Sequence, residues 1–567
     1  MLDCIIKGGT VIDGTGAGRV LADVGISNGR ITAVGSIADS ARRTIDATGL
    51  VVSPGFIDVH THYDAQVKWD PALTPSSIHG VTTVIGGNCG FTLAPVSDDS
   101  IDYVTRMLAC VEGMPVEALQ AALKFDWRTY AEWLSTLEGK LGLNAGFMAG
   151  HSTIRRLVMG NDWKRAATDT EVAAMAAQVE EAVRAGALGF SSSWGGAHGD
   201  HEGNPVPSRF AEQRELVQLA GVLKKFPGTR LEFIPPTTST TFTEETITLM
   251  ANMSAAAGTS LNWNVLAVGQ GGTEAHTWAR IGAHDEAAKL GGQVFALALP
   301  IPLQVRINLR TTLVFNAIDL FRDALSMPRE AKYRALADPA VRRQIAETIV
   351  REGHATRITM DFANLTIDGV GCAQLESLVG RAVGDIAKER GCAPIDAFLD
   401  IALEDDLDTW FLTPAGGSDE ASWKLRARVW DDPRTLVGAS DAGAHLDSTT
   451  SFAFFTDFVG PSVRERKLIS LEEAVRKVTD MPARFYGLKN RGRLSPGFCA
   501  DIVIFDPATV RTGSTAIRSD LPGGQSRIYA EAIGVKRVIV GGSDVVVDGK
   551  LTGALPGTLL RSGRDTG

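Results

Sequence analysis

The sequence predicts an α/β fold, namely a TIM-like (β/α)8 barrel with a small β-sandwich formed by the N- and C-terminal segments. Two observations support this. Short β-prone runs broken by Gly and Asp occupy both ends of the chain, and between them strand-like runs alternate with amphipathic helical runs. Such alternation is typical of a parallel, barrel-like core. With 567 residues and 44% hydrophobic content, the chain can fill one large barrel and a smaller domain.

The two chain ends share a hairpin-like pattern of short strands. The β-prone runs are residues 4–14, 22–26 and 30–35 at the start, and 500–506, 535–542 and 545–550 near the end. We expect residues 1–52 and 485–560 to pair into one β-sandwich domain. Residues 53–484 would then form the barrel with helical insertions, and residues 561–567 a flexible tail.

The middle of the chain supplies the barrel pattern. Its strand-like runs are 82–87, 145–150, 187–191, 230–234, 260–266, 293–298 and 357–360, and helical runs include 169–185 and 209–226. The stretches 327–353 and 385–430 are expected to be helical elaborations of the barrel.

Composition narrows the classes of partner. The net charge is -10, from 56 Lys+Arg and 66 Asp+Glu, with no long basic run, so we expect no nucleic-acid partner. No signal-peptide pattern or run of 18 apolar residues occurs, which predicts no membrane association and a cytoplasmic location. The six cysteines form no disulfide framework and suit a reducing compartment. A small-molecule substrate is expected, and assembly into a homo-oligomer is left open.

His60 and His62 are the first candidate site residues. They follow the apolar, β-prone run 51–59. Residues i and i+2 of a strand point to the same face, and the C-terminal strand ends of a barrel carry its chemistry. Two imidazoles there can share a divalent cation. The alternative is a pair of polar loop residues, which the preceding apolar run disfavours.

Several further motifs resemble those of one family. They are residues 6–14, 87–91, 150–155, 438–445 and 490–501. In their order and setting the chain resembles the amidohydrolase superfamily and, within it, the N-acyl-D-amino-acid deacylase (D-aminoacylase) branch, over nearly its whole length. The resemblance implies a hydrolase that acts on C–N bonds other than peptide bonds and uses one or two divalent ions, Zn²⁺ being the expected one.

The resemblance also implies roles for individual residues. Many amidohydrolases bridge two metals with a lysine at the end of strand four, but residues 186–193 contain none; in this branch a cysteine takes that part, and Cys89 matches it. Asp441 matches the aspartate that ligates metal and transfers the proton. His151 matches a position near the site that either polarises the substrate carbonyl or supports the metal ligands from behind. The plainer alternatives are a small buried hydrophobe for Cys89 and a turn residue for Asp441.

The pattern departs from the branch at the fifth and sixth strands, where two histidines are missing. Glu232 is either an oxygen ligand of the metal or a buried acid paired with an arginine. Asn262 and Asn264 bind the metal weakly, donate a hydrogen bond to the substrate, or only cap a strand end. The branch lysine that receives a substrate carboxylate is absent as well. We nominate Arg306 for that role, against the alternative of an exposed arginine.

A glycine-rich loop carries two further histidines, His198 and His201. This loop either acts as a lid, supplies metal ligands or is simply solvated.

The expected function is metal-dependent hydrolysis of a linear amide, deacylating an N-acyl amino acid or a similar N-acyl compound. One alternative is a cyclic amidase of the hydantoinase or dihydroorotase kind, against which the missing lysine argues. The other is a catalytically degenerate scaffold, against which the joint retention of His60, His62, Cys89 and Asp441 argues.

Overall fold

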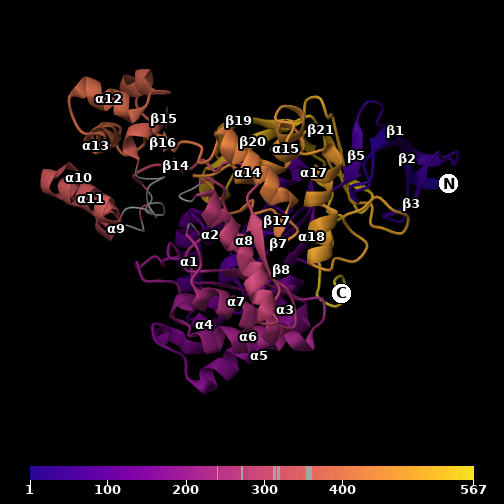
Figure 1. Cartoon of the computed structure of the whole chain (residues 1–567), viewed down its shortest axis with the longest axis horizontal. Coiled ribbons are helices and arrows are strands. Elements are labelled where there is room, and N and C mark those ends of the chain that lie inside the picture. Colours follow the sequence, from indigo (N-terminus) through magenta and orange to yellow (C-terminus); the bar gives the residue numbers. More distant parts are fainter. Residues whose placement is uncertain (239, 270–272, 311–314, 316–318, 353–360) are drawn as a thin grey trace.

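Eight parallel strand positions follow one another in chain order around a barrel in the computed structural model, which describes residues 1–567 except 239, 270–272, 311–314, 316–318 and 353–360 (Figure 1). β6 (Phe56–Asp58), β7 (Val81–Gly86) and β8 (Asn144–Phe147) form the first arc. The second arc continues through β9 (Ala149–Gly150), β10 (Gly189–Ser193), β11 (Arg230–Ile234), β12 (Leu261–Leu266), β13 (Val294–Ala298) and β17 (Thr435–Val437).

The two arcs meet at both of their ends. β8 and β9 are separated only by Met148 and belong to one strand position. A parallel bridge between Thr61 and Ala442 joins the segments that follow β6 and β17. The predicted barrel is therefore confirmed, and the ends of β6 and β17 lie side by side at its mouth.

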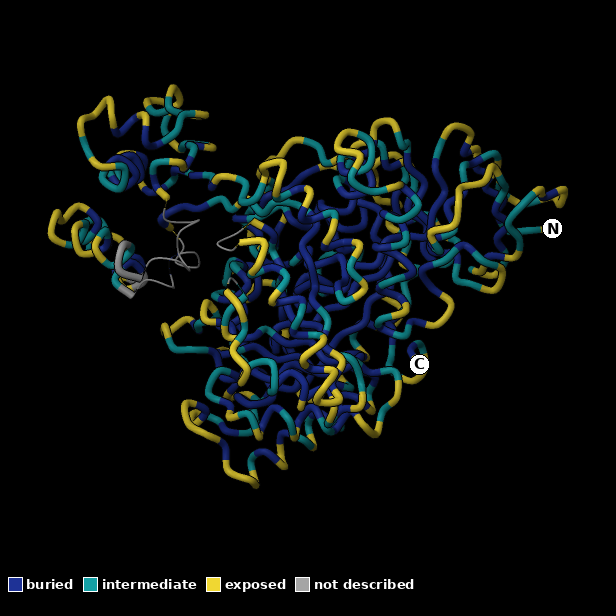
Figure 2. The backbone as a smooth tube through the Cα atoms, in the orientation of Figure 1, coloured by how far each residue is buried: buried dark blue, intermediate teal, exposed yellow. Residues whose placement is uncertain are grey.

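The barrel core is built from strands buried on both faces. All six residues of β7 are buried, as are all five of β10. This is the expected state of parallel strands covered by helices. Figure 2 shows the same arrangement as a buried centre with exposed loops around it.

α5 (Asp169–Ala185) illustrates why the covering helices form where they do. Thr168 and Glu171 make a capping box at its start, and Gly186 with φ 118° ends it. Its buried residues Val172, Met175, Val179, Ala182 and Val183 recur at helical spacing. Further barrel helices are α6 (Gln213–Gly221), α7 (Glu244–Ala257), α8 (Glu274–Lys289), α14 (Glu420–Asp431), α17 (Leu471–Val478) and α18 (Asp480–Phe485).

The two chain ends pair, as predicted. They form a nine-stranded sheet in which β5 (Val51–Pro54) and β18 (Ile502–Phe505) join the N- and C-terminal halves antiparallel. The other strands are β1 (Leu2–Val11), β2 (Val20–Ser27), β3 (Arg30–Gly35), β4 (Ala41–Asp46), β21 (Val535–Val540), β22 (Ser543–Val547) and β23 (Lys550–Leu551). The sheet has a small core of its own, which includes Ile6, Val24 and Ile502.

Two parts of the C-terminal segment depart from the prediction. β19 (Arg511–Arg518) and β20 (Arg527–Ile533) form a separate ribbon, which contacts α15 (Phe454–Val459). Residues 561–567 are not a loose tail. The amide of Gly567 donates to the carbonyl of Gly487, and Thr566 is only 1% exposed. The chain end packs on the barrel because backbone partners and the open space beside Gly228 and Gly487 receive it.

A helical insertion lies between β13 and β17 and stands out from the barrel (Figure 1). It contains α9 (Asp319–Ser326), α10 (Arg329–Ala337), α11 (Pro339–Glu352), α12 (Val383–Arg390), α13 (Pro394–Glu404) and the strands β14 (Arg306–Ile307), β15 (Thr366–Gly369) and β16 (Trp410–Leu412). These elements share a separate hydrophobic core. Helices α10 and α11 occupy residues 329–352 of the stretch 327–353, as predicted. The stretch 385–430 is helical except around β16, and its last helix, α14, belongs to the barrel. The predicted strand 357–360 lies outside the described residues.

Among the described helices, none combines the length and apolar character that a membrane span requires.

Candidate active site

Three side chains from two strand ends converge at the mouth of the barrel. His60 and His62 follow β6 directly, and Cys89 follows β7 in a short turn. The Cys89 Sγ lies 3.5 Å from His60 Nε2 and 3.8 Å from His62 Nε2. All three residues are at least 96% buried. Two imidazole nitrogens and one sulfur thus face a common space within 4.8 Å, as a metal ligand set requires.

Asp441 completes this group from the opposite end of the barrel sheet. It follows β17, and its Oδ1 lies 3.3 Å from His60 Nε2 and 3.1 Å from His62 Nε2. Burial alone would raise the pKa of this carboxyl, but hydrogen bonds from His445, His60 and His62 hold the pKa well below its ordinary value. The side chain is 34% exposed, so a small molecule in the barrel mouth can reach it.

Two residues at this site were not assigned a role from the sequence. Glu112 follows α1 (Ile101–Val111), and its Oε1 lies 3.1 Å from Nδ1 of His62. His445 places Nε2 3.4 Å from the second oxygen of Asp441. A carboxylate beside the far nitrogen of a ligating histidine orients its ring and raises its basicity. The only sequence feature that could have indicated a role for His445 is its spacing of four residues from Asp441.

The electrostatics of this group fit a cation. Burial raises the pKa of the Cys89 thiol and of Glu112 well above their ordinary values, and raises the pKa of Asp64 and Glu232 to about 7. So many buried acidic groups demand a compensating positive charge. A divalent ion supplies that charge and keeps a coordinating thiol deprotonated. The donor set of the site is therefore chemically suited to one.

The turn that carries Cys89 is held by side chains from β10, β11 and the segment that follows β6. Asp64 accepts from the amide of Gly87 (2.9 Å), and Glu232 accepts from the amide of Cys89 (2.8 Å). The hydroxyl of Ser191 accepts from the amide of Gly90 (3.0 Å) and donates to the carbonyl of Gly87 (2.5 Å). These bonds hold Cys89 at φ 58°, a conformation that costs a non-glycine residue about 1 kcal/mol or more.

Glu232 and the two asparagines form an internal chain instead of facing the barrel mouth. Tyr486 donates to Asn262 (3.2 Å), Asn262 donates to Asn264 (2.9 Å), and Asn264 donates to Glu232. In this arrangement Glu232 supports the cysteine turn, and among the described residues it is neither one of the clustered ligand candidates nor paired with an arginine. The substrate roles expected for Asn262 and Asn264 do not fit, because their amide groups are buried and bonded to each other.

His151 is also a support and not a polarising group. Its ring is fully buried, with Nδ1 2.8 Å from the hydroxyl of Ser192 and Nε2 2.9 Å from Glu215. Glu215 accepts from Arg155 at 2.9 Å as well. Because both ring nitrogens are occupied, the oxyanion role expected for His151 is not available in this arrangement. The alternative expectation, structural support behind the site, describes its place.

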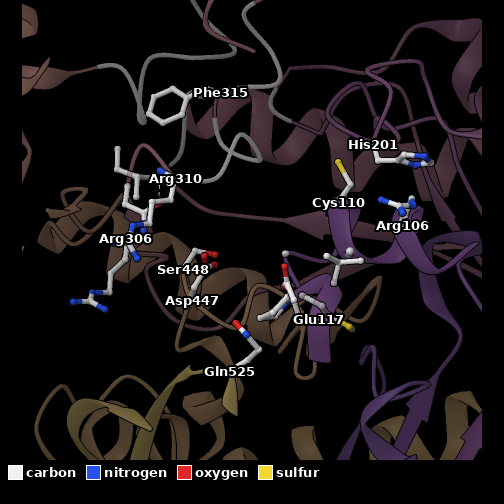
Figure 3. A pocket seen from close by; sticks show the side chains of 17 residues that line it. Arg106, Cys110, Glu117, His201, Arg306, Arg310, Phe315, Asp447, Ser448 and Gln525 are labelled. Atoms are coloured by element: carbon white, nitrogen blue, oxygen red, sulfur yellow. Dashed lines mark hydrogen bonds between the residues drawn. The ribbon is translucent and has the colours of Figure 1, made fainter. Parts of the chain in front are cut away.

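A cavity of about 650 Å³ is a candidate substrate space, although none of His60, His62, Cys89 and Asp441 lines it (Figure 3). Its wall includes Gly113 and Asp447, which are chain neighbours of Glu112 and His445. Arg306 also lines it, but the Nε atom is paired with Asp368 and the guanidinium lies 4.8 Å from the ring of Trp410. The nominated carboxylate receptor therefore already has one acid partner from the insertion, while its Nη1 has no hydrogen-bond partner among the described residues.

Comparison with known proteins agrees with this geometry. The amidohydrolase family matches residues 43–550. The D-aminoacylase of Alcaligenes xylosoxydans xylosoxydans is 29% identical, covering 98% of this chain and 97% of the relative. An uncharacterised protein of Mycobacterium tuberculosis is 32% identical, covering 89% and 84%.

A solved structure shows the same likeness. The N-acyl-D-glutamate deacylase of Bordetella bronchiseptica, complexed with zinc and a phosphonate inhibitor, is 26% identical with a TM-score of 0.67, covering 99% of this chain and all of that one. Fold, site and sequence therefore agree: the chain belongs to the amidohydrolase family and is a hydrolase of C–N bonds other than peptide bonds.

Proposed function

We propose that this protein hydrolyses linear N-acyl amides, with N-acyl amino acids as the substrate class and Zn²⁺ as the metal. The observation that carries the proposal is the convergence of His60, His62, Cys89 and Asp441 at the barrel mouth. Nitrogen, sulfur and oxygen donors together suit zinc. The likeness to a D-aminoacylase and to an N-acyl-D-glutamate deacylase supports the substrate class.

The residues divide the chemistry among them. When bound, a divalent ion supplies Lewis acidity for the scissile carbonyl and acidifies water at neutral pH. Asp441 is an anionic, solvent-reachable carboxylate that can accept a proton from the attacking water and return it to the leaving nitrogen. Glu112 lies beside Nδ1 of His62, and Ser191 with Glu232 holds Cys89.

The experiment pairs metal analysis with a substrate panel. Protein purified without chelator is expected to contain zinc and to hydrolyse N-acetyl and N-formyl amino acids of both configurations, but not hydantoins or dihydropyrimidines. Opening of the cyclic compounds alone would transfer the assignment to a cyclic amidase. Absence of metal, with no activity after metal addition, would identify a degenerate scaffold.

Replacing Cys89 with alanine is expected to weaken zinc binding by about 10²-fold or more. Structural zinc sites bind with about 10–16 kcal/mol shared among four ligands, so one ligand accounts for roughly 3 kcal/mol. Competition with a chromophoric chelator measures the change. Cys392→Ala is the matched control, because Cys392 packs against the core of the insertion. Unchanged zinc affinity in Cys89→Ala would remove Cys89 from the ligand set.

Replacing Ser191 with alanine tests the turn without touching a ligand. The variant loses both backbone contacts at Gly87 and Gly90, so Cys89 is held less firmly. Loss of such supporting partners typically lowers metal affinity by about 10- to 100-fold. The same chelator competition provides the readout, with exposed Ser135→Ala as control. A metal affinity equal to that of the wild type would show that Ser191 is not needed to hold the turn.

A further inference from the structure

The loop that follows β10 places a fourth histidine beside the site, after His60, His62 and His445, and the sequence left its role open. His198 lies in this glycine-rich loop, and its ring centroid is 5.2 Å from that of Phe91, two residues after Cys89. The charged groups that act on its ring are Asp441, His62 and His445 of the site, together with Arg209 of its own loop. His198 therefore shares the electrostatic environment of the candidate metal centre, although it is not one of the clustered ligand atoms.

The backbone around His198 is firmly held. Its carbonyl accepts from the amide of Val206 (3.2 Å) and from Nη1 of Arg209 (3.2 Å). The following turn is closed by Asp200, which accepts from the amides of Glu202 and Asn204 at 2.9 Å each. A side chain on such a loop keeps its direction without ordering on substrate binding, as an electrostatic catalyst requires.

The ring itself is oriented by Ser193. The hydroxyl of Ser193 accepts from the amide of Gly195 (3.0 Å) and lies 2.7 Å from Nδ1 of His198. Ser193 can accept from Gly195 and donate its own proton to Nδ1 at the same time, and in that arrangement the imidazole proton sits on Nε2. Burial lowers the pKa of His198 to about 3, so the ring is neutral at physiological pH. Nε2 of His198 has no hydrogen-bond partner among the described residues. It is also absent from the fully buried polar atoms that lack a partner, so a ligand can reach it.

We propose that His198 is a catalytic residue that donates an Nε2–H hydrogen bond to the substrate carbonyl oxygen as it becomes the tetrahedral oxyanion, with Ser193 as its positioning residue. The inference rests on the proposed function and assigns to His198 the part that His151 and Asn264 cannot take. Water adds to the carbonyl carbon, the C=O π pair moves to the oxygen, and the water proton passes to Asp441. Collapse restores the carbonyl, breaks the C–N bond and returns that proton to nitrogen.

Two substitutions separate this role from a structural one. The side-chain nitrogen of glutamine overlaps imidazole Nε2, whereas that of asparagine overlaps Nδ1. We expect His198→Asn to lower kcat by about 10²- to 10³-fold, as removal of an oxyanion donor does, and His198→Gln to recover activity to within roughly tenfold of wild type. KM is expected to change little in both variants. Glu202→Gln, an exposed residue of the same loop, is the control.

Binding of a transition-state mimic gives an independent readout. The probe is the methylphosphonate analogue of the N-acetyl amino acid that the wild type hydrolyses best, with its Kd measured by calorimetry. The Kd is expected to rise in His198→Asn by the same factor by which kcat/KM falls, while zinc content stays at the wild-type level. The ¹⁵N spectrum of histidine-labelled protein is expected to show the Nε2–H tautomer for His198. In Ser193→Ala the ring is expected no longer to be fixed in one tautomer.

The outcomes are distinct. Equal impairment of His198→Asn and His198→Gln, unchanged phosphonate affinity, or an Nδ1–H tautomer would overturn the role of His198 while leaving the proposed function intact. A wild type that hydrolyses no compound of the linear panel would refute the proposed function, and the inference would fall with it.

Discussion

Replacing Asp441 with asparagine is expected to lower kcat by about 10⁴-fold, the upper end of the range for general acid–base catalysis. The reason is that one carboxylate serves in both proton transfers. Asparagine keeps the shape and one oxygen near His60 and His62 but can neither accept the water proton nor return it. Steady-state kinetics on the best linear N-acyl substrate measures the loss.

The control for this variant is Asp431→Asn, an exposed aspartate in the segment that leads into β17. It is expected to retain wild-type kinetics. Circular dichroism and zinc content at saturating zinc are expected to stay close to those of the wild type in Asp441→Asn, because His60, His62 and Cys89 remain and asparagine keeps one oxygen beside the histidines. Wild-type turnover in Asp441→Asn would show that another group transfers the proton and would refute the mechanism.

Replacing Glu215 with alanine is expected to lower the free energy of unfolding by about 3–5 kcal/mol, the usual cost of removing one partner of a buried ion pair. Glu215 is 1% exposed and accepts from both Arg155 and His151 at 2.9 Å. Without it, the fully buried guanidinium of Arg155 would keep its carbonyl partners but lose its counter-charge. Urea denaturation followed by tryptophan fluorescence measures the loss.

Glu212→Ala is the matched control, since Glu212 lies three residues earlier and pairs with Arg214 at the exposed surface. Exposed ion pairs contribute about 0–1 kcal/mol, so little change is expected there. A Glu215→Ala protein as stable as Glu212→Ala would show that the buried network contributes nothing to folding. His151 packs behind the site and takes no part in proton transfer. At denaturant concentrations below the unfolding transition, we therefore expect kcat to fall less in Glu215→Ala than in Asp441→Asn.

The barrel strands and helices could be predicted closely from local pattern. The predicted strand 230–234 coincides with β11 and the predicted helix 169–185 with α5. Both have a clear periodicity, and α5 also has Thr168 and Gly186 as boundary residues. The C-terminal tail was mispredicted because its polar, glycine-containing composition resembles that of free chain ends. Its order depends on backbone partners at Gly487 and Lys489, which are distant in sequence.

The ligand candidates could be predicted, but the roles of their neighbours could not. The two histidines, Cys89 and Asp441 stand at predictable strand ends, and the structure brings them together. Glu112 and His445 were missed, and Glu232 was left open between a metal ligand and a paired buried acid. No local signal shows which buried acid faces a ligand and which faces a backbone amide.

By itself, the amino-acid sequence determined the order of strands and helices and the residue types at the barrel mouth, since both follow from short-range periodicity and turn chemistry. Only the tertiary structure decided which nitrogen and oxygen atoms are already bonded and which remain open. That distinction arises from contacts such as Ser193 with His198, Asn264 with Glu232 and Arg306 with Asp368, whose directions are set by the packing of the whole barrel.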